Sequence, residues 1–273
     1  MAKRRLDTLL AERGLFPSRS RAAASVMAGE VRVGAGRRRA EKPGEMIDVQ
    51  EPVSVDERAA FVSRGGVKLA NALAASGLDV AGRRALDVGA STGGFTDCLL
   101  QRGASEVVAV DVGYGTLDYR LRVDPRVRVM ERTNARALTP ELLRDRLGDG
   151  ELLDVATIDV SFISLTKVLG PVLGCLAAEH DVLAMVKPQF EVGRGRLGKG
   201  GVVRDADDRR SALVGVGEAA LSLGEVVLGY HSSGLPGPKG NRETFAWLAP
   251  ATLREGGART AAELETMART VEP

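Results

Sequence analysis

The stretch that decides the fold is Leu86-Asp87-Val88-Gly89-Ala90-Ser91-Thr92-Gly93-Gly94-Phe95-Thr96. It predicts a strand that ends at Asp87, a turn of small residues, and a helix that begins near Gly94. Such a turn lets backbone N–H groups approach a ligand closely, beside the N-terminal end of a helix. The glycines stand at positions 89, 93 and 94, which does not fit the G-x-G-x-x-G spacing of dinucleotide-binding proteins. An acidic residue before them suits a ligand with a positive amino group and no pyrophosphate, such as S-adenosylmethionine.

Strand-like apolar runs alternate with helical segments on both sides of this stretch. The runs cover residues 84–88, 107–110, 127–130, 155–158, 182–186, 226–230 and 244–248, and helical periodicity covers residues 94–101 and 165–178. This alternation predicts an α/β fold with an open, mostly parallel sheet that helices cover on both faces. A Gly/Pro-rich stretch joins the last two runs, which indicates an antiparallel hairpin at the edge of the sheet.

Polar residues stand where the strands end. Asp87, Asp111, Asn134 and Asp159 all follow or end predicted strands. Open α/β sheets bind ligands at the carboxyl ends of their strands. A carboxylate at position 111 can accept hydrogen bonds from both hydroxyls of a ribose. The alternative is that the glycine-rich turn only lets a strand and a helix pack, but the three recurring aspartates make that alternative weaker.

Charge is unevenly distributed along the chain, although the formal net charge is only +2. The first 45 residues carry eleven Lys and Arg against five Asp and Glu, and the remaining 228 carry 27 against 31. This indicates a local basic module on a mildly acidic body and excludes a uniformly basic coat.

Two short helices and several short strands are expected in the basic module. Leu6, Leu9 and Leu10 have helical spacing, and Ser18 and Gly29 stand where a second helix would begin and end. The runs 31–33 and 46–49 are expected to be strands, and the polar stretch 51–61 a linker. The unit has about 50 residues, which is too few to bury much core alone.

Several classes of protein are disfavoured. Cys98 and Cys175 each fall in a predicted helix without C-x-x-C spacing, so we expect neither a disulfide framework nor a zinc site, and His180 and His231 alone make no metal centre. The chain has no apolar run of about 18 residues and no clean secretion signal at its N-terminus. We therefore expect a cytoplasmic protein with no bound metal and no association with membranes.

A phosphate-binding motif is nearly matched in residues 193–200, Gly-Arg-Gly-Arg-Leu-Gly-Lys-Gly. These satisfy G-x-x-x-x-G-K, but Gly200 stands where a P-loop needs a Ser or Thr hydroxyl for magnesium. The segment is therefore interpreted as a basic surface loop. Two interpretations stay open: the loop approaches phosphates, or it is solvated and has no ligand.

Two lysines and two carboxylates are candidates for catalysis: Lys68, Asp159, Lys187 and Glu243. Lys187 follows the fifth apolar run, so it should lie level with Asp159. Arranged around a cofactor pocket, such residues could methylate a hydroxyl, because a lysine whose pKa is lowered from about 10.4 can accept the proton. Each residue alone is more typical of a surface charge or an ion pair. We expect Lys68, Lys187 and the loop 194–199 to converge on one face.

With these motifs the sequence resembles the TlyA (haemolysin A) family of ribosomal RNA 2′-O-methyltransferases, essentially from end to end. The resemblance rests on Val62-Ser63-Arg64-Gly65-Gly66, residues 87–96, Asp111-Val112-Gly113-Tyr114-Gly115, Glu131-Arg132-Thr133-Asn134-Ala135-Arg136, Asp159-Val160-Ser161-Phe162-Ile163-Ser164-Leu165, residues 186–191, and residues 240–243. It implies a small α+β S4 RNA-binding domain followed by a Rossmann-like class I methyltransferase domain of the FtsJ/RrmJ type, with a mostly parallel seven-stranded sheet. We expect the domains at residues 1–57 and 63–273, with a linker at 58–62.

The resemblance also implies functional residues. The expected catalytic tetrad is Lys68, Asp159, Lys187 and Glu243, with Lys187 as the base. The expected contacts to S-adenosylmethionine are Asp87, Gly89, Ala90, Ser91, Thr92, Gly93, Gly94, Asp111, Asn134 and Asp159. Phe162 is expected near the target nucleotide, which is a cytidine ribose of 23S, and in some members also of 16S, ribosomal RNA.

RNA docking is expected on the basic module, at Arg5, Ser18, Arg19 and Arg21, because a helix N-terminus favours phosphate. A basic face needed only for solubility is the alternative. The expected partners are ribosomal RNA or ribosomal subunits, with no obligate protein partner. Actinobacterial relatives carry Arg-x-Trp-Val in the linker, which is thought to couple RNA docking to cofactor binding. Here the aligned residues are Ala59-Ala60-Phe61-Val62, with Arg58 displaced by one position.

Three hypotheses differ in class: an RNA methyltransferase, an RNA-binding protein that has lost activity, and a membrane-damaging haemolysin. The four intact candidate catalytic residues disfavour the second hypothesis. The absence of a membrane-length segment in the sequence disfavours the third.

Overall fold

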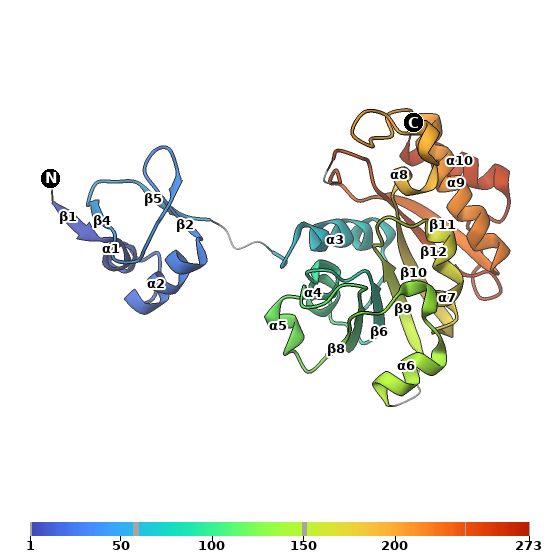
Figure 1. The fold of residues 1–273 in the computed structure, drawn as a ribbon, viewed down its shortest axis with the longest axis horizontal. Helices are drawn as coiled ribbons and strands as arrows, with labels where there is room; N and C mark the ends of the chain where they lie inside the picture. Colours follow the sequence, from blue (N-terminus) through green and yellow to red (C-terminus); the bar gives the residue numbers. More distant parts are fainter. Residues whose placement is uncertain (1, 57–59, 149–151, 238, 273) are drawn as a thin grey trace. The chain divides into compact units, whose positions relative to one another are not determined.

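The computed structural model describes residues 2–56, 60–148, 152–237 and 239–272. The chain divides into two compact units, Met1–Ala59 and Ala60–Pro273 (Figure 1). Positions 58 and 59 of the expected linker lie outside the described residues. Ala60 and Val62 bond within the second unit: the Val62 N–H donates to Asp97 Oδ2 at 2.8 Å, and the Ala60 carbonyl accepts from Gln101.

Among its described residues, 2–56, the first unit contains two helices, α1 (Leu6–Glu12) and α2 (Arg19–Ala28), and five short strands. Strands β1 (Lys3–Arg5) and β4 (Met46–Asp48) form one antiparallel pair, and β3 (Arg38–Arg39), β2 (Val31–Val33) and β5 (Val53–Val55) form a three-stranded sheet. The helix ends are confirmed. Ser18 Oγ accepts from the Arg21 N–H, and Gly29 ends α2 in the left-handed region at φ 78°. Leu6, Leu9 and Leu10 of α1 are buried in the core of the first unit, as their spacing predicts.

The expected linker at 51–61 is wrong at its start, because β5 pairs with β2 in antiparallel register. Val53 alternates with Ser54 and packs against the small core of the first unit. Pro52 stands just before the strand, where its missing N–H removes no ladder hydrogen bond.

The second unit is built on a seven-stranded sheet, in the order β11-β12-β10-β9-β6-β7-β8. Its strands are β6 (Arg84–Val88), β7 (Glu106–Val110), β8 (Val127–Met130), β9 (Leu153–Ile158), β10 (Leu176–Val186), β11 (Glu225–Ser232) and β12 (Thr244–Pro250). Strands β10, β9, β6, β7 and β8 pair in parallel, and β12 is antiparallel to both β10 and β11, so that six strands run in one direction. This confirms the predicted mostly parallel sheet and the hairpin at its edge. The chain reverses its direction across the sheet between β6 and β9, where such sheets bind ligands.

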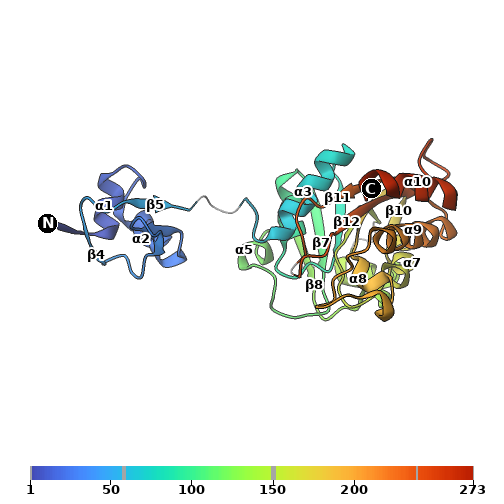
Figure 2. The ribbon, with the colours of Figure 1, turned by 90° about the horizontal axis from the view of Figure 1, so that it is seen from above.

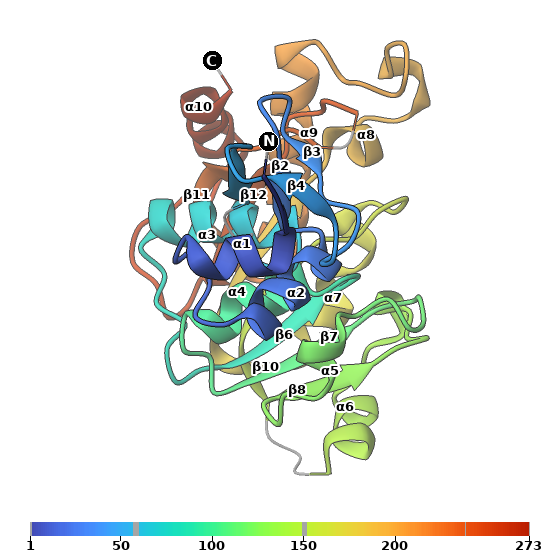
Figure 3. The same ribbon diagram turned by 90° about the vertical axis from the view of Figure 1, so that its left-hand side faces the viewer.

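Helices cover both faces of this sheet. They are α3 (Arg64–Ser76), α4 (Gly94–Gln101), α5 (Tyr119–Arg122), α6 (Pro140–Leu147), α7 (Leu169–Leu173), α8 (Pro188–Glu191), α9 (Ala206–Ser222) and α10 (Ala261–Val271), with 3-10 turns η1 (Ala135–Ala137), η2 (Leu165–Lys167) and η3 (Arg194–Arg196). Leu86 and Val88 of β6 pack in one core with residues of α7, α9 and α10, and Ala85 packs in the other with residues of α3 and α4. Figure 2 shows α3 and α9 on opposite sides of the sheet. Figure 3 shows α6 beyond the β8 edge and α10 at the β11 edge.

The predicted helix at 165–178 is wrong in its second half. Helix α7 ends at Leu173, Cys175 lies in a turn rather than in a helix, and β10 begins at Leu176. Pro171 cannot donate a backbone hydrogen bond and Gly174 favours a stop, so the helix ends within a few residues. Cys98 lies in α4 as predicted, and both thiols are free and buried.

Neither a membrane span nor a metal cluster occurs among the described residues. They contain no helix long and apolar enough to cross a membrane. They also contain no group of three or more His, Cys, Asp or Glu side chains that could hold a metal ion.

Candidate active site

Glycines bring the parts of the site together. At Gly89, φ is +88° and an added Cβ would lie 2.4 Å from the carbonyl oxygen of Asp159, so only glycine lets the ends of β6 and β9 approach this closely. At Gly94, an added Cβ would lie 2.8 Å from the backbone N of Gly66. The first turns of α3 and α4 therefore touch through their backbones. Lys68 follows Gly66 within the first turns of α3 and is held at the end of the sheet.

A first cavity, of about 330 Å³, lies at the carboxyl ends of β6, β7 and β9. Five of the residues predicted to bind the cofactor line it: Gly89, Ser91, Asp111, Asn134 and Asp159. The Asp111 carboxylate is held in place by two backbone donors, the Ser91 N–H at 2.8 Å and the Gly113 N–H at 2.6 Å. Ser91 has φ +50°, a strained conformation for a residue other than glycine.

The other residues predicted to contact the cofactor do not line this cavity: Asp87, Ala90, Thr92, Gly93 and Gly94. Asp87 is fully buried and accepts hydrogen bonds from Thr96 Oγ1 at 2.6 Å and Thr157 Oγ1 at 3.2 Å. Burial raises the pKa of Asp87 to about 7, the threonine bonds oppose this rise, and the charge of Asp159 adds to it. In this structure Asp87 therefore ties β6 to α4 and β9 beneath the glycine-rich turn.

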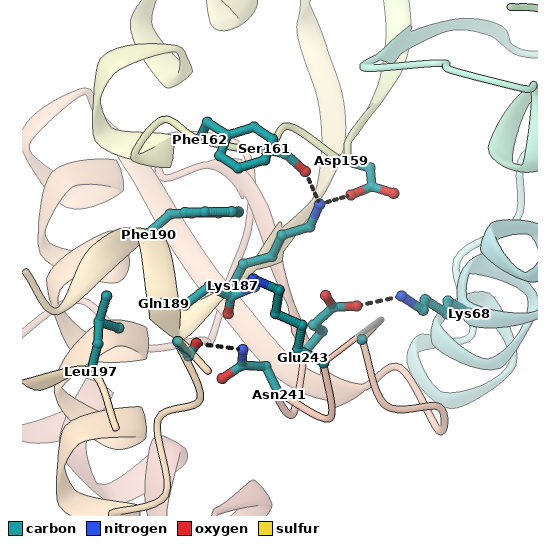
Figure 4. A pocket seen from close by; sticks show the side chains of 13 residues that line it. Lys68, Asp159, Ser161, Phe162, Lys187, Gln189, Phe190, Leu197, Asn241 and Glu243 are labelled. Carbon is teal, nitrogen blue, oxygen red and sulfur yellow. Dashed lines mark hydrogen bonds and ion pairs between the residues drawn. The ribbon is translucent and has the colours of Figure 1, made fainter. Parts of the chain in front are cut away.

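A second cavity, of about 370 Å³, is lined by all four residues predicted to be catalytic, Lys68, Asp159, Lys187 and Glu243. The Lys187 ammonium lies 2.5 Å from Asp159 Oδ1 and donates to Ser161 Oγ at 2.9 Å. The Lys68 ammonium forms an ion pair with Glu243. Figure 4 shows Lys187 reaching toward Asp159 and Ser161 from one side, while Lys68 faces Glu243 from another. Both lysines are almost fully buried, so each charge is partnered as burial requires.

The two cavities meet at Asp159, Ser161 and Phe162, which line both of them. Phe162 is 92% exposed and has φ +65°, which a bulky residue rarely adopts. Its ring centroid lies 5.3 Å from that of Phe190. Figure 4 shows the two side chains from close by. A ligand group in the first cavity and one in the second would thus meet beside an aromatic side chain.

Sequence reasoning assigned no role to Ser161, Gln189, Phe190 and Asn241, although each lies in a quoted motif and lines the second cavity. Asn241 is buried. Its side chain donates to the Gly201 carbonyl at 3.0 Å and accepts from the Val203 N–H at 2.9 Å. It therefore connects the loop before α9 to the loop that carries Glu243. The sequence signal that could have found Asn241 is its position two residues before Glu243, the candidate catalytic carboxylate.

The expected convergence of basic residues holds in part. Lys68 and Lys187 line one cavity, but the loop that follows Gly193 contributes Leu197 and Gly201 to it. Arg196 instead faces α9, where its guanidinium lies 3.3 Å from Asp208 and 3.4 Å from Ser211. For Arg196 the expectation is wrong, because a carboxylate on the neighbouring helix binds its guanidinium.

In the first unit, two of the residues predicted to contact RNA, Arg5 and Arg19, lie beside a carboxylate to which the sequence analysis assigned no role. Asp7 is buried and accepts from Arg5 at 2.7 Å, and Arg19 lies 3.3 Å away. Hydrogen bonding to Arg5 is the main cause that lowers the pKa of Asp7 to about 2. Ser18 Oγ is occupied as the cap of α2, but its hydroxyl can still donate, and Arg21 is exposed.

Known proteins identify the class to which this fold and site belong. The model of the FtsJ-like methyltransferase family matches residues 61–249, and that of the S4 domain matches residues 4–51. The chain therefore belongs to the FtsJ-like methyltransferases, and it is a methyltransferase with an S4 domain at its N-terminus.

Within that class the chain belongs to the TlyA family. It is 49% identical to the 16S/23S rRNA (cytidine-2′-O)-methyltransferase TlyA of Mycobacterium tuberculosis, over 93% of each chain. It is 44% identical to the putative rRNA methyltransferase YqxC of Bacillus subtilis, over 90% of this chain and 85% of that one. Among solved structures, a putative hemolysin from Streptococcus thermophilus is 39% identical, with a TM-score of 0.71 over 99% of this chain and 96% of that chain.

Proposed function

We propose that the chain transfers a methyl group from S-adenosylmethionine to the 2′-OH of a cytidine ribose in 23S ribosomal RNA, with 16S ribosomal RNA as a second target. The observation that carries this proposal is the junction at Asp159, Ser161 and Phe162. There the first cavity, in which two backbone N–H groups bind the Asp111 carboxylate, meets the second cavity, which the buried Lys68 and Lys187 line. The names of the relatives supply the substrate class. A cytoplasmic location accords with such a substrate.

The first cavity fits S-adenosylmethionine. Both Asp111 oxygens accept a backbone N–H, and each keeps a lone pair for a ribose hydroxyl. Gly89 and Ser91 expose backbone on the same wall. When bound, the cofactor supplies an electrophilic methyl group on a sulfonium sulfur. Asp159, at the junction, would contact both ligands.

The second cavity fits the target ribose. We assign the base to Lys187, which must enter the step as a free amine and takes the 2′-OH proton on Nζ. With its proton removed, the ribose oxygen would be free to take the methyl group that the bound cofactor would supply. Asp159 and Ser161 orient Nζ, and Lys68 with Glu243 provides a second charged pair on the opposite wall. Phe162 offers a face on which a base can stack.

RNA docking is assigned to Arg5, Ser18, Arg19 and Arg21 of the first unit.

The test of the whole proposal is transfer of tritiated methyl groups to ribosomal subunits from a strain without this methylation, followed by mapping of the labelled nucleotide in both RNAs. Label on a cytidine 2′-oxygen is expected. Binding without any transfer would contradict the proposal and support a catalytically silent RNA-binding protein.

Replacing the proposed base should stop the chemistry while the cofactor still binds. Lys187→Ala is expected to lower kcat by about 100-fold or more, the usual contribution of general base catalysis. The dissociation constant for S-adenosylmethionine, measured by calorimetry, should stay within a few-fold. Lys199→Ala is the matched control, because Lys199 is exposed and lines neither cavity. Turnover of Lys187→Ala equal to that of the control would remove Lys187 as the base.

A further inference from the structure

A third cavity, which we call the outer trough, adjoins the second cavity, which we call the catalytic cavity from here on. It measures about 440 Å³ and shares four lining residues with that cavity, Phe162, Gln189, Phe190 and Leu197. Beyond them it is lined by Arg136, Ser164 and Lys167, among others. The Phe162–Phe190 pair therefore stands between a pocket for the reacting group and a groove that continues along the surface.

The outer trough is basic. Arg136 lies in η1 and Lys167 ends η2, and both side chains are exposed. Within the part of the chain that the structure describes, neither forms a salt bridge. Among the described residues, the Arg136 guanidinium makes one long contact, from Nε to Asn134 Oδ1 at 3.5 Å, and the Arg136 backbone N–H donates to the same oxygen at 3.0 Å. By contrast, Arg120, Arg126 and Arg128 are all paired with carboxylates.

The Glu191 carboxylate bonds to Ser164, which lines the outer trough, and each of its two oxygens accepts a hydrogen bond from the chain. Glu191 is largely enclosed, and it accepts from Ser164 Oγ at 2.5 Å and from the Leu165 N–H at 2.9 Å. These bonds hold the segment that carries Lys167 in place. Two cations without carboxylate partners thus line a groove that opens from the catalytic cavity, and such a groove suits an anion.

We propose that the outer trough binds a backbone phosphate next to the methylated ribose, through Arg136 and Lys167. This rests on the proposed function. A ribose 2′-OH lies beside its own 3′-phosphate, so an RNA strand that enters the catalytic cavity must carry phosphates out of it. RNA has one negative charge per nucleotide, and Lys and Arg contacts with it release counterions. Phe162 and Phe190 offer aromatic faces to the bases at the same point.

The test compares Arg136→Ala/Lys167→Ala with wild type in methyl transfer to ribosomal subunits that lack the modification, over a series of KCl concentrations at fixed magnesium. The variant should raise KM for the subunits about tenfold or more. It should also reduce the slope of log KM against log salt by about 1, since each phosphate neutralised by Lys or Arg adds roughly one unit to that slope. Values of kcat at saturating subunits should stay within about threefold.

Two further variants make the test specific to charge. Arg136→Lys/Lys167→Arg keeps both cations and should keep the wild-type salt slope. Arg102→Ala/Arg144→Ala removes two exposed arginines that line none of the three cavities, and it should change neither KM nor slope. Because Arg136 touches Asn134 of the cofactor cavity, the dissociation constant for S-adenosylmethionine is measured for every variant, and Lys167→Ala is tested alone.

The outcomes separate the two proposals. If wild type transfers no methyl group to either subunit, the proposed function fails. If wild type is active but Arg136→Ala/Lys167→Ala matches the arginine control in KM and salt slope, the outer trough is not a phosphate site. A charge-preserving variant as defective as the alanine variant would also overturn this proposal, as would a defect confined to cofactor affinity or kcat.

Discussion

Among single residues, Asp87 shows most clearly how burial changes the pKa of a carboxyl group. It lies beneath the glycine-rich turn, bonded to Thr96 and Thr157, with the charge of Asp159 nearby. Burial raises its pKa to about 7, against an ordinary value of 3.8. Between these two pH values the unfolded chain releases a proton that the folded chain keeps. Folding therefore becomes less favourable as pH rises through this range and is independent of this group above it.

Asp87→Asn should remove that pH dependence. The free energy of unfolding of the variant, relative to wild type, is expected to rise by about 2–4 kcal/mol between pH 4 and pH 8, because the amide has no charge to bury. Chemical denaturation at several pH values measures this, and Asp145→Asn, on the exposed face of α6, is the control. A difference that does not vary with pH would contradict the raised pKa. Cofactor affinity should remain, because Asp87 does not line the first cavity.

At the scale of elements, the buried Glu272, near the C-terminus, joins α9 and α10 to the loop before β12. Glu272 follows α10 and accepts from Arg209 Nε of α9 at 2.9 Å, and Arg242 lies 3.2 Å from the same oxygen. The backbone carbonyl of Glu272 accepts from Arg210 Nη1 at 2.9 Å. Arg242 immediately precedes Glu243. The packing of two helices and the position of a candidate catalytic carboxylate therefore depend on one buried side chain.

Glu272→Ala is expected to lower the free energy of unfolding of the second unit by about 3–5 kcal/mol, because it leaves the buried Arg209 charge with backbone carbonyls but without its carboxylate partner. Thermal and chemical denaturation measure the loss. Glu265→Ala, in an exposed ion pair with Arg269 on the same helix, should cost less than about 1 kcal/mol. Equal losses in the two variants would show that the Glu272 cluster contributes nothing beyond surface charge.

The whole molecule divides its chemistry between two units of different charge. The first 45 residues carry the excess of basic side chains, and the second unit carries the carboxylates of the two cavities. In the first unit the buried Asp7 carboxylate orients Arg5 and Arg19. RNA affinity is therefore expected to depend mainly on the first unit, and cofactor affinity on the second alone.

Arg19→Ala/Arg21→Ala should weaken binding to ribosomal subunits and lower its salt slope, with cofactor affinity unchanged. The expected decrease is about one unit for each phosphate that the two arginines neutralise in the wild-type complex. Filter binding over a salt series measures the slope. Because Arg19 lies beside Asp7, Arg21→Ala is also tested alone, and thermal unfolding checks that the first unit stays folded. An unchanged salt slope would move the RNA site away from the start of α2.

Local signals predicted most of the fold. The apolar runs locate all seven strands of the large sheet, and Ser18 and Gly29 mark the ends of α2 correctly, because caps depend on neighbours within a few residues. The two errors have different causes. At 165–178 the helical periodicity outweighed the local stop signals Pro171 and Gly174. The strand Val53–Val55 is too short to be recognised from its own residues, because it is defined by its pairing with β2.

The sequence by itself determined the α/β alternation, the family and four charged residues that line the second cavity, because these depend on residue type and spacing. Only the tertiary structure decided which polar side chains line a cavity and which are buried or paired elsewhere. It buried Asp87 beneath the turn, turned Arg196 toward Asp208, and left Arg136 and Lys167 beside the cavity without carboxylate partners among the described residues. The physical reason is that exposure and pairing depend on atoms far apart in the chain, such as Lys68 and Glu243, which meet only when α3 packs beside the sheet.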